Sequence, residues 1–377
     1  MLVKKINSER YEIRTIHLIP NDWFVMVDKE LQQLFKTKKS IRIEKLLELL
    51  PLEKIETNIK AVKKKRESNF VVFNPLIQID ADFVRVLAFV KGDGSFNEKR
   101  ISAYNTVSEP LKAFTEFVSK LGCRDMIYVY VTVPASNAAI FGELQGKWSN
   151  ALGIPRNRIS VFERKNKLIR GKSFRSEKEC VEVFCPSDTL AHIVGKIDDM
   201  AKELLPLSKE FQKAYLQGIF SAEGSVTWNK RTGYRAVNIG MKDEKEIERI
   251  AQLLYNFGVS YTKGISNGTS YITITNKRNL DKLNSLDIFE LQPFRASKLR
   301  KLLGGYQRTQ TISCRLEKRI FQIKQILERE ASLPDEIAQL LDLSLNRSQE
   351  ILKLGFDKGL WKRRRSHDSK SPYVYFI

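Results

Sequence analysis

The sequence is poor in the residues that build disulfide bonds and zinc sites. It contains 4 Cys and 3 His in 377 residues, and they are scattered rather than grouped as a zinc knuckle requires. We therefore expect reduced cysteines in the core and no structural zinc. Long apolar runs are lacking too, because no stretch approaches the roughly 18 consecutive apolar residues of a membrane span, and residues 1–7 lack the apolar segment of a secretory signal. These absences predict a cytoplasmic protein without a membrane partner.

Acidic residues are scarce relative to basic ones. The chain has 65 Lys and Arg against 44 Asp and Glu, which gives a formal net charge of +21. Hydrophobic residues make up 42%, as in ordinary globular proteins, and the length suits two or three domains. A positive surplus of this size on a globular chain indicates a polyanionic partner, most often nucleic acid.

Two segments of the sequence repeat one pattern. Residues 83–95 and 213–225 are each a mostly apolar stretch of helical length, followed by a small residue, an acid, Gly and Ser. The two acids, Asp93 and Glu223, lie about one domain length apart. A repeat at this spacing predicts two related units in one chain.

The elements predicted after each apolar helix also repeat. Both copies continue with a strand, an amphipathic helix closed by a glycine, further strands and a last helix. The first copy carries an insertion at about 134–178 with a basic stretch at 164–175. The corresponding ranges are 100–106 and 235–241, 109–121 and 244–257, 126–133 and 270–275, and 187–197 and 279–283.

Both apolar helices carry small residues four positions apart, and residues at that spacing share one helix face. Such a face lets two helix backbones approach closely. Parallel packing of the two faces would bring Asp93 and Glu223 together at one end. The predicted helix interface is Val84, Ala88 and Gly92 in the first helix with Ala214, Gly218 and Ala222 in the second.

Two carboxylates that face a polyanion repel it unless a cation lies between. Mg²⁺ or Mn²⁺ takes oxygen ligands and needs only one or two carboxylates plus phosphate oxygens. Two such ions can clamp the attacking and leaving oxygens of a phosphodiester. We therefore assign Asp93 and Glu223, with Gly92 and Ala222 beside them, as the candidate metal site. The alternative, that both acids merely end helices before a glycine, stays open at this point.

The sequence divides into four predicted parts. Residues 1–78 form an α/β region to which the sequence assigns no role, residues 79–204 and 205–308 are the two repeats, and residues 311–377 are a winged helix-turn-helix. The last prediction rests on three short helices and a hairpin, at 316–329, 333–341, 344–358, 361–365 and 373–377.

A winged helix-turn-helix commonly places its third helix in the major groove of DNA. The cationic cluster on the predicted hairpin suits phosphate contacts. A protein-binding winged helix is the alternative. The candidate DNA contacts are Asn346, Arg347, Gln349 and Lys353 on the helix and Lys362, Arg363, Arg364 and Arg365 on the hairpin.

Residues 86–94 and 216–224 resemble the two signature helices of the LAGLIDADG homing endonucleases, and the likeness extends over about 80–303. The resemblance implies an α+β fold, with tandem pseudo-twofold αββαββα repeats and saddle-shaped antiparallel sheets in a monomer. It implies that Asp93 and Glu223 hold Mg²⁺ for hydrolysis of double-stranded DNA by water. It also implies a supporting catalytic lysine, Lys298, after the segment 291–294.

The first motif has Lys91 and Gly92 where the family usually has Asp and Ala, and the second has Glu223 for Asp. The chain lacks the terminal residues that an intein needs, which indicates a free-standing protein. The added winged helix resembles WhiA-like regulators, which have the same scaffold without cleavage. We therefore carry three hypotheses: a site-specific DNA endonuclease, a non-cleaving DNA-binding transcriptional regulator, and an RNA maturase.

Overall fold

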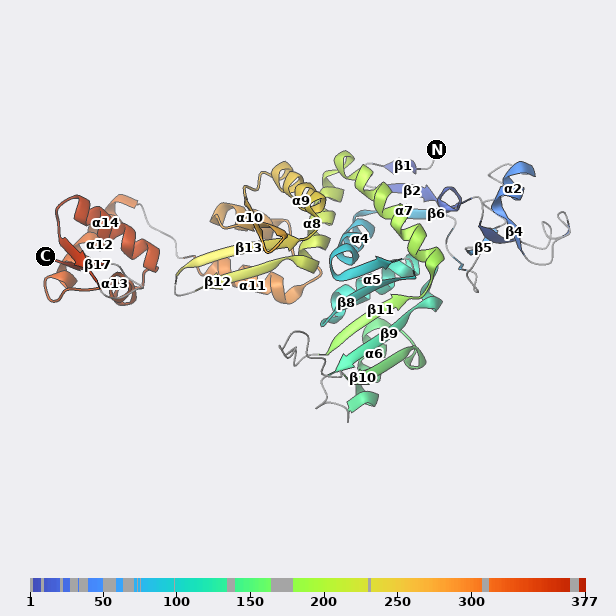
Figure 1. The fold of residues 1–377 in the computed structure, drawn as a ribbon, viewed down its shortest axis with the longest axis horizontal. Helices are drawn as coiled ribbons and strands as arrows, with labels where there is room; N and C mark the ends of the chain where they lie inside the picture. Colours follow the sequence, from blue (N-terminus) through green and yellow to red (C-terminus); the bar gives the residue numbers. More distant parts are fainter. Residues whose placement is uncertain are drawn as a thin grey trace.

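The structure is a computed structural model (Figure 1). It describes residues 3–7, 10–20, 23–27, 33, 40–49, 59–63, 71–72, 74, 76–97, 99–133, 140–163, 179–229, 232–306, 312–366 and 373–377. In these ranges, no helix combines the length and apolar character that would carry it through a membrane. The predicted basic stretch at 164–175 lies outside the described residues.

Two units with the same order of elements form the centre of the molecule, as Figure 1 shows. The first consists of α4 (Ala81–Asp93), β7 (Gly94–Asn97), β8 (Arg100–Asn105), α5 (Ser108–Lys120), β9 (Tyr128–Val133), β11 (Cys180–Cys185) and α7 (Asp188–Leu204). The second consists of α8 (Lys209–Glu223), β12 (Ser225–Asn229), β13 (Tyr234–Met241), α9 (Glu244–Asn256), β14 (Thr262–Ser266), β15 (Thr269–Ile274) and α10 (Lys277–Ser285). Each unit is therefore αββαββα, which confirms the predicted α+β fold class.

The two sheets share one antiparallel topology. The second sheet has the order β12-β13-β15-β14, and the corresponding strands of the first sheet have the same order, β7-β8-β11-β9. The first sheet gains a fifth strand, β10 (Ile159–Glu163), which pairs in parallel with β9 at the edge. This strand and the preceding helix α6 (Phe141–Leu152) come from the inserted segment.

Three strands differ from the ranges that the sequence predicts. The sequence analysis assigns no strand to 180–185 or 262–266, which form β11 and β14. The strand that corresponds to β9 is therefore β14, whereas 270–275, which the sequence analysis pairs with 126–133, corresponds to β11. The parallel strand β10 was not predicted either. A parallel partner is reached through a long connection, here containing α6, and this connection leaves no local signal in the strand itself.

Helices α4 and α8 pack along their small residues at the centre of one continuous hydrophobic core. The predicted interface residues Val84, Ala88, Ala214 and Ala222 are nearly fully buried. A Cβ added to Gly218 would lie 2.8 Å from the Cβ of Ala88 and would overlap the carbonyl oxygen of Arg85. Each helix starts at a capping side chain, Asp80 for α4 and Ser208 for α8.

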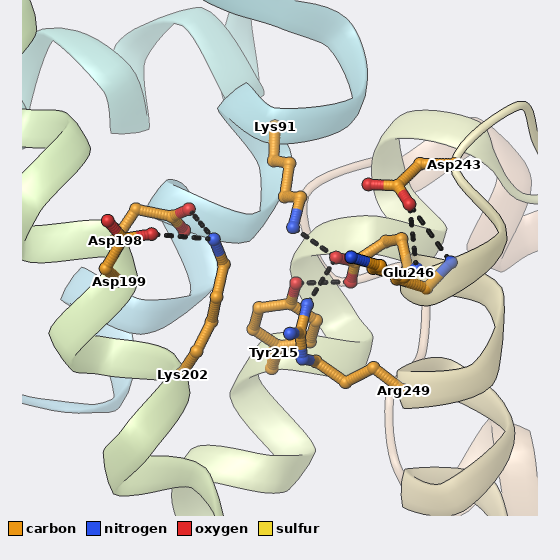
Figure 2. Close-up of polar contacts among 9 residues, drawn as sticks. Lys91, Asp198, Asp199, Lys202, Tyr215, Asp243, Glu246 and Arg249 are labelled. Carbon is orange, nitrogen blue, oxygen red and sulfur yellow. Dashed lines mark hydrogen bonds and ion pairs between the residues drawn. The ribbon is translucent and has the colours of Figure 1, made fainter.

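A buried polar cluster ties the end of α4 to the second unit (Figure 2). The side chain of Glu246 on α9 has no solvent exposure, and its carboxylate accepts hydrogen bonds from Lys91 and Tyr215. Arg249 Nη1 donates to the same carboxylate at 2.5 Å. Lys91 therefore replaces the usual acid of the first motif with a cation that pairs across the two units.

The flanking segments form smaller sheets and a separate helical unit. The N-terminal strands make two three-stranded sheets, ordered β1-β2-β6 and β4-β3-β5. Their elements are β1 (Val3–Asn7), β2 (Arg10–Arg14), the 3-10 turn η1 (Thr15–Leu18), β3 (Phe24–Val27), β4 (Ser40–Arg42), α2 (Ile43–Leu49), β5 (Ile59–Lys63) and β6 (Leu76–Ile79). After α11 (Pro293–Gly304), the chain ends in α12 (Ile312–Leu327), α13 (Pro334–Leu340), α14 (Leu345–Asp357), β16 (Lys362–Arg365) and β17 (Tyr373–Phe376), which share their own hydrophobic core.

The close helix approach predicts that Gly218→Ala destabilises the protein. The added methyl group has no space because backbone atoms of α4 lie within its van der Waals radius. We expect a loss of at least about 2 kcal/mol of unfolding free energy, measured by urea denaturation. The matched control is Gly195→Ala on α7, where a Cβ meets nothing within 4 Å, and we expect it to be neutral or to stabilise by up to about 1 kcal/mol. Equal effects of the two substitutions would contradict the observed packing.

The buried cluster predicts that Lys91→Met destabilises the protein by about 3 kcal/mol, because the substitution leaves the buried Glu246 charge with one cation fewer. The measurement is again urea denaturation at pH 7. The control is Lys277→Met, which breaks the ion pair with Asp281 on α10, where the side chains are 50% and 48% exposed. That exposed pair should cost less than about 1 kcal/mol. Adding Glu246→Gln to Lys91→Met should recover part of the loss, and no recovery would exclude a direct electrostatic coupling.

Candidate functional site

The two acids of the repeated motif lie at the ends of the packed helices. Asp93 is the last residue of α4 and Glu223 is the last residue of α8. A Cβ added to Gly92 would lie 2.5 Å from the Cβ of Ala222 and 3.0 Å from the Cγ of Glu223. The small residues therefore bring the end of one helix directly against the end of the other, as the sequence predicts.

Glycines let the chain turn from each helix into the first strand of its sheet. A Cβ on Gly94 would lie 2.5 Å from the carbonyl oxygen of Val90, and one on Gly224 would lie 2.5 Å from the carbonyl oxygen of Phe220. Any larger residue would push the acid out of its place. The acid–Gly pair is thus a structural unit, in which the glycine holds the preceding carboxylate at the helix junction.

Asp93 is half-buried and has one polar side-chain partner that is itself fixed. Asn105 Nδ2 donates to Asp93 Oδ2 at 3.2 Å. The amide is oriented because its Oδ1 accepts hydrogen bonds from the backbone N–H groups of Thr106 and Val107. Burial raises the pKa of Asp93 to about 7; Arg295 lowers it, the neighbouring Glu223 raises it, and the Asn105 hydrogen bond lowers it.

Glu223 reaches solvent with its side chain. Partial burial raises the pKa of its carboxyl group above the ordinary value, although the charge of Arg295 acts in the opposite direction. Both carboxyl groups are therefore less acidic than free ones. The nearby positive charge does not compensate the cost of holding both groups ionised at this site.

Arg295, on α11, is the cation that the structure places beside the acids. Its Nη1 donates to the carbonyl oxygens of Ser221 at 2.6 Å and Ala222 at 2.7 Å. These carbonyls belong to the last turn of α8, where the helix has no partner of its own for them. Burial lowers the pKa of Arg295, while Asp93 and Glu223 raise it.

Sequence reasoning missed Arg295 and chose Lys298 instead. Lys298 lies on the same helix but has an exposed side chain. No hydrogen bond or ion pair among the described contacts joins it to either acid. The helix start at Pro293 was visible in the sequence, and it would have placed Arg295 in the first turn, near the preceding core. The choice between the two depends on the packing of α11 against α8.

The donor set around the two acids fits a hard divalent cation. Carboxylate oxygens, with the carbonyl groups of Gly92 and Ala222, are the ligand type that Mg²⁺ and Mn²⁺ prefer. The Ala222 carbonyl already accepts one hydrogen bond from Arg295. In the part of the chain that the structure describes, no group of three or more His, Cys, Asp or Glu side chains gathers. Water or phosphate oxygens would therefore complete the coordination.

The predicted DNA contacts of the C-terminal unit lie on α14 and β16. Figure 1 shows α14 far from α4 and α8, the helices that end at the two acids. Asn346, Arg347 and Lys353 are exposed on α14, and Gln349 is half-buried. Arg347 pairs with Glu350 at 2.8 Å. On β16, Lys362, Arg364 and Arg365 are exposed, whereas the guanidinium of Arg363 lies 4.1 Å from the ring centre of Phe356 and 4.3 Å from that of Tyr373.

Comparison with solved structures finds low similarity. The homing endonuclease I-DmoI, in a study of its mesophilic variants, is 13% identical with a TM-score of 0.30, over 56% of this chain and 98% of that chain. A structure of I-DmoI with DNA and Mn is 14% identical with a TM-score of 0.30, over 55% and 96%. Full-length DUF199/WhiA from Thermatoga maritima is 10% identical with a TM-score of 0.36, over 72% and 89%.

Sequence comparison supports the motif-based resemblance. No curated protein matches the chain. A family model described as a LAGLIDADG-like domain matches residues 210–286, and this match confirms the resemblance that the two motifs predict. The chain therefore contains a LAGLIDADG-like domain, whose first helix is α8 and ends at Glu223.

Proposed function

We propose that this protein is a DNA endonuclease that hydrolyses phosphodiesters with divalent metal ions held by Asp93 and Glu223. The observation that carries the proposal is the pairing of these acids at two parallel helix ends. Burial and mutual repulsion raise the pKa of Asp93 to about 7 despite Arg295. An under-compensated acid pair of this kind is destabilising by itself and is stabilised by a bound cation.

Each side chain at the site has a definite task in this reaction. Asp93 and Glu223 would hold the metal, and the fixed amide of Asn105 orients the Asp93 carboxylate. The bound metal would polarise the phosphate and lower the pKa of an attacking water. Arg295 anchors the carbonyl end of α8 and adds positive charge beside the phosphate. With one acid from each unit, the pair can address both strands of a duplex.

The open face of the second sheet suits contacts with base edges. Asn238 on β13 donates to Thr227 Oγ1 at 3.1 Å and accepts from Thr273 Oγ1 at 2.9 Å. This row crosses three strands and consists of amide and hydroxyl groups, which can donate and accept in the major groove. The net charge of +21 supplies the sequence-independent attraction to phosphates.

A second candidate function is DNA binding without cleavage, as in a transcriptional regulator. The observation in its favour is Arg295, because a guanidinium near both carboxylates partly supplies the charge that a metal would bring. The exposed cations on α14 and β16 give the chain a further surface for phosphates, which a regulator can use without any acid pair. Both candidates share the DNA partner and differ only in the chemistry at Asp93 and Glu223.

The pKa of Asp93 predicts a pH dependence of metal binding. The metal binds the carboxylate form, so the apparent affinity for Mg²⁺ or Mn²⁺ should rise as the pH passes 7 and level off above about pH 8. Below the pKa, it should fall about tenfold for each pH unit. Calorimetric titration of Mn²⁺ between pH 6 and 8.5 measures this. A flat profile in this range would contradict metal binding at Asp93.

Cleavage is tested on a randomised duplex DNA library with Mg²⁺ or Mn²⁺. We expect strand cuts by the wild type and a loss of at least about 100-fold in Asp93→Asn and Glu223→Gln. Asp281→Asn, a charge-matched change at a side chain of α10 that is 48% exposed, is the control and should cut normally. Cleavage by the double variant Asp93→Asn with Glu223→Gln would exclude the metal assignment. Specific binding without cuts in either metal would favour the regulator.

Arg295→Met should shift the pH midpoint of metal binding to higher pH, because the charge of Arg295 lowers the pKa of Asp93. The matched control is Lys298→Met, which removes the same charge from the exposed side of the same helix. It should leave the midpoint unchanged. A shift in the control and none in Arg295→Met would assign the supporting role to Lys298, as the resemblance implies.

A further inference from the structure

The open face of the first sheet carries a cluster of aromatic side chains. Tyr128 and Tyr130 come from β9, Phe162 from β10 and Phe184 from β11. The ring centre of Tyr130 lies 4.5 Å from that of Phe184 and 5.2 Å from that of Phe162. Tyr128 stacks on Phe184 with ring centres 5.9 Å apart. We call these four residues the aromatic face.

The strand register, rather than loose packing, exposes these rings. Along β9 the intervening valines, such as Val129 and Val131, are fully buried in the core, so the tyrosines point to the opposite side. Phe184 is 5% exposed and forms the floor of the cluster. Tyr128, Tyr130 and Phe162 are 40%, 36% and 47% exposed and form its outer surface.

The fold does not require aromatic residues at these positions. In the first sheet, Phe184 pairs with Ser102 and Tyr128, and Glu182 pairs with Tyr130. The paired strands of the two sheets can be aligned residue by residue. In this alignment Thr273, Thr262 and Gly264 of the second sheet correspond, in that order, to Phe184, Tyr128 and Tyr130. The second unit has Tyr271 at the position of Glu182, with its ring over Gly264, and small side chains at the positions of Phe184, Tyr128 and Tyr130. The cluster of four rings is therefore particular to the first unit.

Positive charge lies next to the aromatic face. The guanidinium of Arg100 on β8 lies 5.2 Å from the ring centre of Phe184. Glu182 pairs with it at 2.9 Å and also accepts from Tyr104, which fixes its position over the ring. An aromatic ring beside a guanidinium is a combination that binds the bases and phosphates of a nucleic acid.

We propose that the aromatic face binds single-stranded DNA, with unpaired bases stacked on Tyr128, Tyr130 and Phe162. A duplex offers only the edges of its bases in its grooves, whereas ring faces stack on bases that are free of the helix. The choice of DNA rests on the proposed function. The aromatic face is separate from the acid pair, so its occupancy does not depend on cleavage.

The test is the affinity of the full chain for a labelled oligothymidylate of about 12 nucleotides, measured by fluorescence anisotropy without metal. Tyr128→Ala, Tyr130→Ala and Phe162→Ala should each weaken binding by about 5-fold to 100-fold. Tyr130→Phe keeps the ring and should bind as the wild type does. Tyr255→Ala, on α9 at a tyrosine that is 72% exposed, is the control and should leave the affinity unchanged.

Several outcomes would overturn the proposal. These are no binding of the single strand by the wild type, unchanged affinity in all three alanine variants, or binding of oligouridylate RNA in place of DNA. Circular dichroism checks that the variants fold, and Tyr130→Leu, which keeps an apolar side chain without a ring, serves where alanine disrupts the sheet. Absence of cleavage by the wild type with single-strand binding intact would overturn the proposed function alone. Cleavage by the wild type without single-strand binding would overturn this proposal alone.

Discussion

The close contact between α4 and α8 is the constraint on which the rest of the structure depends. Gly218 lies against Ala88 and the backbone of α4, and Gly92 lies against Ala222. Because backbones rather than side chains meet, the relative position of the helices is fixed with little freedom to relax. The positions of the two acids, at the helix ends, are therefore fixed as well. A longer side chain at the interface would separate the acids and also split the core that both units share.

The same contact buries polar and charged residues of α4, and partners from the rest of the chain reduce the electrostatic cost of that burial. The charge of Arg295 lowers the pKa of Asp93, Lys91 pairs with the buried Glu246, and Arg85 Nε donates to Gln217 at 2.9 Å. Polar residues of α4 thus find their partners in the second unit. Burying an unpaired charge costs roughly several kcal/mol, whereas burying a charge that is paired and hydrogen-bonded costs far less. The two units are therefore held in register by charge pairing as well as by apolar burial, whereas Asp93 and Glu223 remain under-compensated.

The central features followed from the sequence because they depend on local periodicity. The positions of Ala88 and Gly92, four residues apart, specify a helix face, and a glycine after each acid specifies the turn into the sheet. Features that depend on contacts between distant segments did not follow. The choice of Arg295 over Lys298 depends on how α11 meets α8, and the partner of Lys91 is a residue on α9. The parallel strand β10 follows an inserted helix, α6. The sequence of a strand does not predict whether its neighbour runs parallel or antiparallel.

The two units resemble each other in their cores and differ on the open faces of their sheets. Their strand order and their helix ends correspond, because both must pack on the same shared core. Their open faces bear no such constraint, and one carries a hydrogen-bonded row around Asn238 while the other carries the aromatic face. A duplex with its own twofold symmetry would favour two similar faces. Two dissimilar faces instead favour a substrate whose halves differ, such as a duplex on one side that passes into separated strands on the other.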